Sequence, residues 1–192
     1  PHHLLLSRRD LSELGTNGRM NPPLRRERRR REVYERVVDG TVDVIATDHA
    51  PHTPAEKDAS IWDAPSGVPG VETALPLLLA EARNPDTALT YERVRDLTAT
   101  NPAAVFGVPQ KGAIEPGRDA DLVLVDTTET TEIRADERHT DCGWTPFGGL
   151  EAVFPEWTMV PGTTVYERDA EEDVFYDHAG ENVRDADGEL VE

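Results

Sequence analysis

Residues 42–52 read VDVIATDHAPH, an apolar run rich in β-branched side chains that ends in Asp48, two histidines and a proline. A near-continuous Val/Ile run without polar alternation is typical of a parallel strand that is covered on both faces. It therefore predicts a buried strand over residues 41–47, with Asp48 at its carboxyl end. In an α/β barrel, that end carries the catalytic groups. An aspartate at a strand-to-loop junction can equally cap backbone N–H groups, so the run alone leaves both roles open.

The segments around this run predict helices and strands in alternation over the first 108 residues. The order of helix then strand is that of a parallel α/β sheet. Apolar residues at helical spacing, together with Gly, Thr and Asn-Pro boundary signals, set the expected limits. The expected elements are a strand end over residues 1–7, a helical turn over 10–14, helices over 24–38 and 71–83, a helix capped by Thr90, and a short helix over 101–106.

From Lys111 onward, short β-rich runs and turns replace the helical patterns. Residues 120–126 read ADLVLVD and predict a strand, and Pro161-Gly162 predicts a turn between two further strands. After Tyr166, eleven acidic residues outnumber two arginines, which is typical of a solvated, poorly ordered extension, although residues 174–176 could pair as an edge strand. The predicted parts are an α/β part over residues 1–108, a small β domain over 109–168 and an acidic C-terminal extension over 169–192.

Polar side chains suited to one site occur on three loops near the predicted strand. They are Asn21 on the first loop, Asp48 and His52 on the second, and Ser66 and Gly67 on the third. Loops at one end of neighbouring barrel strands converge, so these groups could surround a small polar substrate. Asp48 is able to ligate a metal and to transfer a proton, while Asn21 and His52 could recognise a carboxylate or an amide. Each also has a structural role available, since Asn21 precedes a proline and could simply set a turn.

Several motifs together resemble those of the dihydroorotases, a family of the cyclic amidohydrolase superfamily. The most specific are MNPPLR at residues 20–25 and ATDHAPH at 46–52. The others are PHHLLL at 1–6, GVPGVETALP at 67–76, TNPA at 100–103 with Phe106-Gly107, and the run from Lys111 to Asp126. The resemblance extends over residues 1–167.

The resemblance implies the C-terminal part of a (β/α)8 barrel joined to a small β-sandwich domain. It also implies zinc-dependent, reversible hydrolysis of dihydroorotate to N-carbamoyl-aspartate in pyrimidine synthesis, with one or two zinc ions in the full-length protein. On this resemblance Asp48 would be a metal ligand and the acid/base that takes a proton from the attacking water and returns it to the ring nitrogen. Asn21 and His52 would contact the substrate, and the backbone of Ser66 and Gly67 would close over it.

The chain departs from the family pattern in its metal ligands. It contains no counterpart of the family's His-x-His pair, its bridging acidic or carboxylated-lysine ligand, or its other metal histidines, and a zinc hydrolase site needs about three protein ligands. His2 and His3 lie downstream of those ligand positions, so we interpret them as strand-end residues near the pocket. The sequence also begins inside an element. We therefore expect a fragment of a longer protein that is inactive by itself.

Two other functions stay open on the sequence. Allantoinases and dihydropyrimidinases share the barrel and the aspartate, but they usually lack the second histidine of the DHAPH motif, and their ring substrates carry no carboxylate. His52 and Asn21 therefore favour a dihydroorotase. A non-catalytic dihydroorotase-like subunit that scaffolds aspartate transcarbamoylase would also lack the upstream ligands, but it would not need Asp48. A homodimer and a contact with aspartate transcarbamoylase are the protein partners that the resemblance suggests.

The composition indicates a compartment and excludes some partners. The formal net charge is −18, and Lys57 and Lys111 are the only lysines beside 18 arginines. Such a surface resembles the cytoplasmic proteins of salt-loving archaea, although an acidic protein of an ordinary organism would show the same charge. It would repel nucleic acids and anionic membranes. Because Cys142 is the only cysteine and no apolar run is long enough to span a bilayer, we expect a cytoplasmic location.

The basic stretch RRERRRRE at residues 25–32 resembles a nucleic-acid patch at first sight. However, Glu27, Glu32 and Glu35 supply acidic partners at helical i, i+3 and i, i+4 spacing, and the whole chain is strongly negative. We therefore interpret this stretch as a solvated helix face.

Overall fold

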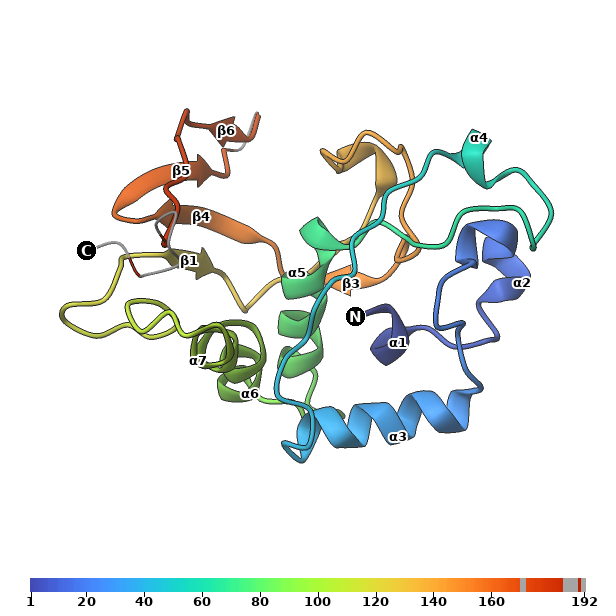
Figure 1. Ribbon diagram of the computed structural model, residues 1–192, viewed down its shortest axis with the longest axis horizontal. Coiled ribbons are helices and arrows are strands. Elements are labelled where there is room, and N and C mark those ends of the chain that lie inside the picture. The colour runs from blue at the N-terminus through green and yellow to red at the C-terminus, as the bar shows by residue number, and fades with distance from the viewer. Residues whose placement is uncertain (170–171, 185–189, 191–192) are drawn as a thin grey trace.

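Helix α5 (Val71–Arg83) lies at the centre of the structure, with other elements on several sides of it (Figure 1). The computed structural model describes residues 1–169, 172–184 and 190. Apolar side chains occupy nearly every position in the middle turns of α5. Its buried residues are Thr73, Ala74, Pro76, Leu77, Leu78 and Leu79. A helix that is apolar on more than one face is buried on more than one side, which makes α5 the core element of the chain.

Two clusters of buried apolar side chains meet at α5. The first contains Leu77 with Leu6, Met20, Leu24, Val68, Ile133, Phe147, Ala152 and Phe154. The second contains Leu78 and Leu79 with Leu4, Val37, Leu89, Val94, Leu97 and Val153. Full burial of one such leucine stabilises the fold by about 1.5–3 kcal/mol. The two clusters therefore pack segments that are far apart in the sequence, from Leu4 to Phe154, against one helix.

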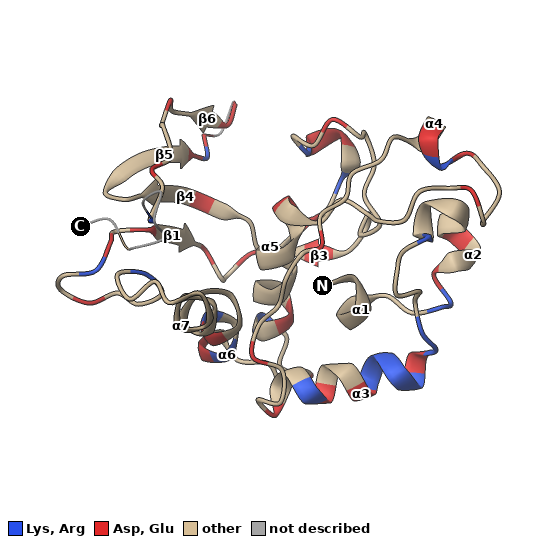
Figure 2. Cartoon of the chain, in the orientation of Figure 1, with Lys and Arg blue, Asp and Glu red and all other residues tan. Residues whose placement is uncertain are grey.

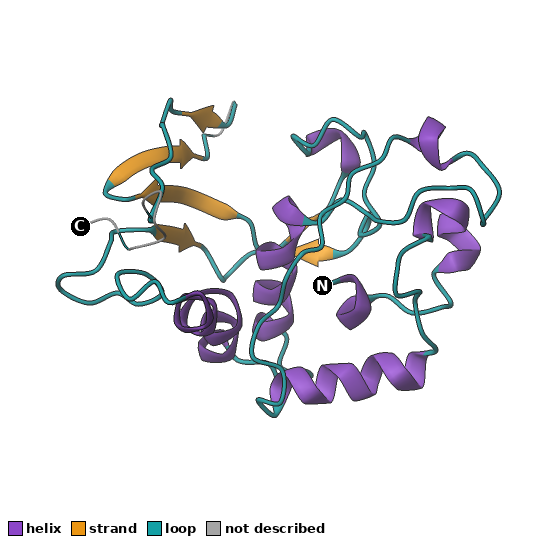
Figure 3. Ribbon diagram, viewed as in Figure 1, coloured by secondary structure: helices purple, strands orange, loops and turns teal. Residues whose placement is uncertain are grey.

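The first part of the chain is helical, apart from loops (Figure 3). Its elements besides α5 are α1 (His2–Leu5), α2 (Leu11–Leu14), η1 (Gly15–Gly18), α3 (Glu27–Val38), α4 (Pro54–Lys57), α6 (Tyr91–Arg95), the π-helical turn η2 (Asp96–Thr100) and α7 (Asn101–Phe106). The helices predicted at α2, α3, α5, α6 and α7 are confirmed. Thr90 caps α6 by accepting the Arg93 N–H, and Gly107 ends α7 with a φ of 63°. No helix of the described residues is long and apolar enough to cross a membrane.

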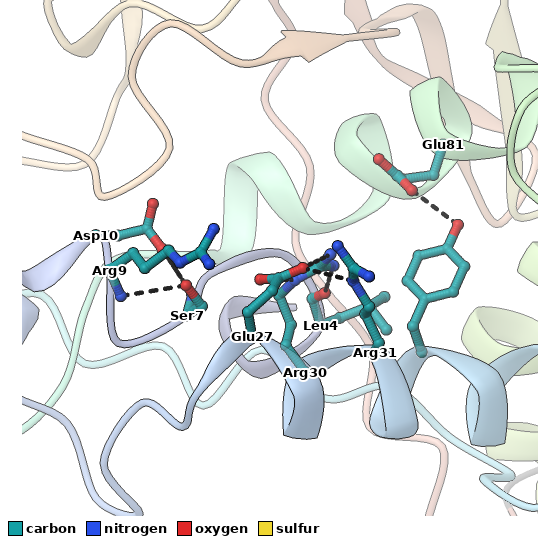
Figure 4. A network of polar contacts seen from close by, with 9 residues as sticks. Leu4, Ser7, Arg9, Asp10, Glu27, Arg30, Arg31 and Glu81 are labelled. Atoms are coloured by element: carbon teal, nitrogen blue, oxygen red, sulfur yellow. Dashed lines mark hydrogen bonds and ion pairs between the residues drawn. The ribbon is translucent and has the colours of Figure 1, made fainter.

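Helix α3 carries basic and acidic residues next to each other along the chain (Figure 2). Glu27 accepts hydrogen bonds from Arg30 at 2.8 and 3.0 Å and from Arg31 at 3.0 Å, and Arg30 also donates to the Leu4 carbonyl (Figure 4). The hydrogen bonds from Arg30 are the main cause that lowers the pKa of Glu27 to about 2. The predicted solvated helix face with internal ion pairs is confirmed.

All strands of the described residues lie beyond residue 121. A four-stranded antiparallel sheet has the order β1 (Leu122–Val125), β4 (Pro155–Val160), β5 (Thr163–Glu167) and β6 (Val174–Phe175). A separate pair consists of β2 (Thr131–Glu132) and β3 (Glu151–Ala152), with the 3-10 turn η3 (Ala135–Glu137) between them. Gly162 has a φ of 77° in the turn from β4 to β5, as expected for that position. The predicted edge pairing near residues 174–176 is confirmed by β6.

Two predicted elements are wrong. The expected strand over residues 41–47 is an extended segment, and in the described part of the chain only His49 beside it pairs, in one parallel bridge with Val68. A strand needs an adjacent strand along its edge, and the described residues supply only single contacts to this segment, such as the Ile45 N–H that donates to the Leu97 carbonyl at 3.2 Å. The segment is also half-buried or exposed, unlike a strand covered on both faces. The expected strand end over residues 1–7 is instead a helical turn, since its leucines are good helix formers and none of its residues is β-branched.

The α/β class and the order of a helical part before a sheet agree with the sequence interpretation. The limits at residues 108 and 168 and the sandwich itself stay predictions. Residues near β3 pack on the central helix, because the Val153 N–H donates to the Pro76 carbonyl at 3.0 Å. Residues 170–171, 185–189 and 191–192 of the predicted acidic extension lie outside the described residues.

Candidate active site

The three loops that carry the predicted site residues are joined by backbone hydrogen bonds. The Gly67 N–H donates to the Arg19 carbonyl at 3.1 Å, close in sequence to Asn21. The Ala50 N–H donates to the Val68 carbonyl, also at 3.1 Å. The structure therefore brings the three loops side by side, although they are far apart in the sequence.

Asp48 stands out by its backbone conformation. Its φ is 49°, and no other non-glycine residue of the described ranges has a positive φ. Aspartate tolerates this left-handed region better than most residues, but the conformation still costs about 1 kcal/mol. The side chain is exposed, and its carboxylate accepts no hydrogen bond from any described residue. Asp48 therefore does not cap a backbone N–H group of any described residue.

His49 supplies the cap instead. Its Nδ1 atom accepts the backbone N–H groups of Gly70 at 3.0 Å and of Val71 at 3.2 Å, where α5 begins. The first N–H groups of a helix have no partner within the helix, so the ring satisfies two of them. Because Nδ1 accepts, the neutral ring carries its proton on Nε2. The segment of Asp48 is thus fixed to the start of the central helix.

Two imidazole rings lie near Asp48, that of His2 buried and that of His3 half-buried. Burial lowers the pKa of His2 to about 4, with the chain's amino terminus and His3 acting in the same direction and Asp48 opposing them. Burial also lowers the pKa of His3, assisted by the amino terminus and Arg25 and again opposed by Asp48. The rings are therefore neutral at pH 7, with centroids 4.4 Å apart. Among the described residues, His2 Nδ1 and His3 Nε2 have no hydrogen-bond partner.

The remaining polar candidates differ in exposure. His52 is half-buried, with Nδ1 4.0 Å from a carboxylate oxygen of Glu56. Asn21 and Ser66 are exposed, so their polar atoms are accessible. No hydrogen bond joins the side chains of Asn21, Asp48 and His52 to one another in the described part of the chain. The structure thus gathers their loops without linking these side chains directly.

Gly67 occupies a position that admits only glycine. Its φ is 126°, and a Cβ atom there would lie 2.4 Å from the Cβ of Ala50 and 3.1 Å from the Ala50 carbonyl oxygen. Contacts under 3.0 Å do not occur for real Cβ atoms, so this loop approaches the Asp48 segment as closely as backbone permits.

The sequence interpretation missed two residues that connect these loops. Lys57, the last residue of α4, is fully buried, and its Nζ donates to the carbonyls of Arg19 and Pro65, each at 3.0 Å. Trp144 donates from Nε1 to the His52 carbonyl at 2.6 Å. The sequence held a signal for Lys57, because it is one of two lysines in a chain that otherwise uses arginine. It held no comparable signal for Trp144.

The described residues do not form a metal centre by themselves. No group of three His, Cys, Asp or Glu side chains among them could hold a metal ion. A zinc hydrolase site needs about three protein ligands, and one exposed carboxylate does not hold the ion alone. An ion beside Asp48 would therefore need ligands from outside these residues.

An apolar cavity of about 580 Å³ lies elsewhere, between the α5–α7 region and β1. Its lining includes Leu79, Phe106 and Val123 but none of the predicted site residues. It is not part of the candidate site.

Known proteins match this chain over most of its length. The amidohydrolase family matches residues 6–165. A dihydroorotase of Halobacterium salinarum is 64% identical over 169 residues, which are 88% of this chain and 40% of that protein. A dihydroorotase of Methanosarcina acetivorans is 46% identical over 172 residues, which are 88% of this chain and 36% of that protein. The chain thus spans about two fifths of the length of these curated relatives.

Solved structures share the fold. An L-hydantoinase (dihydropyrimidinase) from Arthrobacter aurescens superposes with a TM-score of 0.81 at 31% identity, over 87% of this chain and 38% of that one. A D-hydantoinase (dihydropyrimidinase) from Thermus sp. superposes with a TM-score of 0.83 at 27% identity, over 91% of this chain and 39% of that one. Sequence and fold thus lead to one conclusion: the chain belongs to the amidohydrolase family.

Proposed function

We propose that this chain is the C-terminal part of a dihydroorotase. Such an enzyme catalyses the reversible hydrolysis of dihydroorotate to N-carbamoyl-aspartate in pyrimidine biosynthesis. The observation that carries the proposal is the 64% identity to the Halobacterium salinarum dihydroorotase over 88% of the chain. The net charge of −18 supports a salt-loving source. A cytoplasmic location, a homodimer and a contact with aspartate transcarbamoylase belong to the same proposal and rest on the family alone.

Asp48 moves the proton in this proposal. Its carboxylate would accept a proton from the attacking water and pass it to the ring nitrogen that leaves the amide carbonyl. The exposed carboxylate accepts no hydrogen bond within the described residues, so both oxygens are available for this task.

The other predicted residues bind the substrate in this proposal. The amide of Asn21 and the ring of His52 would recognise the carboxylate and the ring amide of dihydroorotate. The backbone of Ser66 and Gly67 would close over it, and the missing side chain of Gly67 leaves room for that approach.

Zinc belongs to the proposed activity of the full-length protein. When bound by the full-length protein, such an ion would supply Lewis acidity to the amide carbonyl and would lower the pKa of water to about 7. The described residues do not fit a complete zinc site, so Asp48 would be the ligand from this chain and the others would come from outside it. On this proposal, the 192 residues alone are inactive and hold no stoichiometric zinc.

A second candidate is a hydantoinase or dihydropyrimidinase activity. The observation in its favour is the match to two such structures at 27–31% identity. The substrates differ in chemistry, because dihydroorotate carries a carboxylate beside the ring amide and dihydrouracil and hydantoin do not.

Turnover by the full-length protein that contains this chain tests the proposal. Dihydroorotate, dihydrouracil, hydantoin and allantoin are offered separately, in buffer of high salt. We expect efficient turnover of dihydroorotate alone. Preference for another ring would establish the sister activity, and no turnover of any ring would refute both. Metal analysis of the isolated 192-residue chain tests the proposal that most zinc ligands come from outside it. Tightly held, stoichiometric zinc in this chain would overturn that proposal.

A further inference from the structure

Lys57 is a buried cation without an acidic partner. It is fully buried at the end of α4, and no carboxylate of the described residues forms an ion pair with it. Burying an ammonium group costs several kcal/mol unless its protons find acceptors. The acceptors here are the carbonyls of Arg19 and Pro65, each 3.0 Å from Nζ. The ring of Trp144 lies 5.8 Å from Nζ and contributes a cation–π contact.

These partners belong to the three loops of the candidate site. Arg19 precedes Asn21 on the first loop, and its carbonyl also accepts the Gly67 N–H at 3.1 Å. Pro65 directly precedes Ser66 and Gly67 on the third loop. A single ammonium group therefore holds two of the loops at the points where their predicted substrate contacts begin.

The second loop is attached through Trp144 and α4. The Trp144 ring lies 5.8 Å from the ammonium group, and its Nε1 donates to the His52 carbonyl at 2.6 Å. Helix α4 itself begins with a capping box, in which Thr53 and Glu56 exchange hydrogen bonds, and Glu56 lies 4.0 Å from the His52 ring. His52, α4 and Lys57 thus form one connected unit.

We propose that Lys57 is a positioning residue that sets the spacing of the three substrate-binding loops through its charge. The proposal deepens the proposed function and rests on it. Two carbonyl oxygens that converge on one point repel each other, and a cation between them turns that repulsion into attraction. An apolar side chain of equal length would fill the space but, within the described part of the chain, would leave the Pro65 carbonyl without a donor and the Arg19 carbonyl with the Gly67 N–H alone.

The test compares two lysine variants in the full-length protein that contains this chain. In Lys57→Met, we expect the KM for dihydroorotate to rise by about tenfold or more while kcat changes much less, because the loops bind the substrate in ground and transition state alike. Lys111→Met is the matched control, since Lys111 is the only other lysine and pairs with Asp119 and Asp121 away from these loops. It should leave KM unchanged.

Hydrogen exchange without substrate gives a readout that does not depend on turnover. The backbone amides of residues 19–21, 64 and 66–68 should exchange faster in Lys57→Met than in the unmodified protein and in Lys111→Met, while α5 stays protected. An unchanged KM with unchanged exchange, or the same changes in Lys111→Met, overturns the proposal.

If Lys57→Met does not fold, Lys57→Gln is judged by the same criteria, and loss of the fold in both variants also overturns the proposal. A protein that does not turn over dihydroorotate at all refutes the proposed function, whereas the exchange measurement still decides the role of Lys57.

Discussion

The Nδ1 atom of His49 lies 3.0 Å from the backbone nitrogen of Gly70 and accepts its N–H, so a histidine ring caps the central helix. The replacement His49→Ala removes this hydrogen bond and the one from Val71 at 3.2 Å. We expect the free energy of unfolding to fall by about 1–2 kcal/mol, the usual effect of losing a helix cap. Urea unfolding of the full-length protein at constant salt measures it.

The control for this prediction is His178→Ala, because His178 is exposed. Its replacement should change the free energy of unfolding by less than about 0.5 kcal/mol. Equal losses in both variants would show that the ring of His49 does not act as a cap.

Asp48 can be tested by a change that keeps its shape. Asn tolerates a positive φ as Asp does, so Asp48→Asn should retain the fold and the melting temperature. The amide cannot accept the proton, and we expect kcat for dihydroorotate to fall by about 10²–10⁴-fold. Asp43→Asn, in the same segment and also exposed, should leave kcat unchanged. Steady-state kinetics of the full-length protein measure both, and an active Asp48→Asn enzyme contradicts the proposed role.

Gly67 should tolerate no side chain. In Gly67→Ala the new Cβ would lie 2.4 Å from the Ala50 Cβ, and the backbone would keep a φ of 126° that alanine rarely adopts. We expect a loss of more than about 2 kcal/mol in the free energy of unfolding, from overpacking and backbone strain together. Thermal unfolding measures the loss. Gly148→Ala is the matched control, since its Cβ would meet open space and its φ is not positive; a similar loss there would contradict the steric account.

The helices could be predicted from the sequence because their signals are local. Gly70 before α5, Thr90 before α6 and Gly107 after α7 each act within one turn of the helix that they limit. The convergence of three loops could also be predicted, since the loops of Asn21, Asp48 and Gly67 do adjoin. The chemical roles of these residues follow from resemblance and stay predictions.

The remaining features depend on contacts between distant residues. The segment expected as a strand over residues 41–47 has the right composition, but a strand is completed by neighbours, and the described residues do not provide them. The cap by His49 depends on the backbone N–H of Gly70, 21 residues further along the chain. The burial of Lys57 depends on the Arg19 carbonyl, 38 residues earlier in the chain. Neither periodicity nor local motifs encode such contacts.

The ion pair between Glu27 and Arg30 predicts how stability depends on pH. Hydrogen bonds from Arg30 hold the pKa of Glu27 at about 2 in the folded chain, against an ordinary value of 4.5. Because the folded state binds this proton more weakly than the unfolded chain, the pair stabilises the fold above pH 4.5, and the stabilisation is lost as the pH falls towards 2.

Glu27→Gln should therefore lower the free energy of unfolding by about 1 kcal/mol at pH 7, a value reduced for solvent screening, and by progressively less below pH 4.5. Unfolding of the full-length protein in urea between pH 7 and pH 3 measures the trend. Glu32→Gln, whose carboxylate is more exposed beside Arg29, should change stability by less than about 0.5 kcal/mol throughout. A loss in Glu27→Gln that does not vary with pH would show that packing, and not charge, connects this residue to α3.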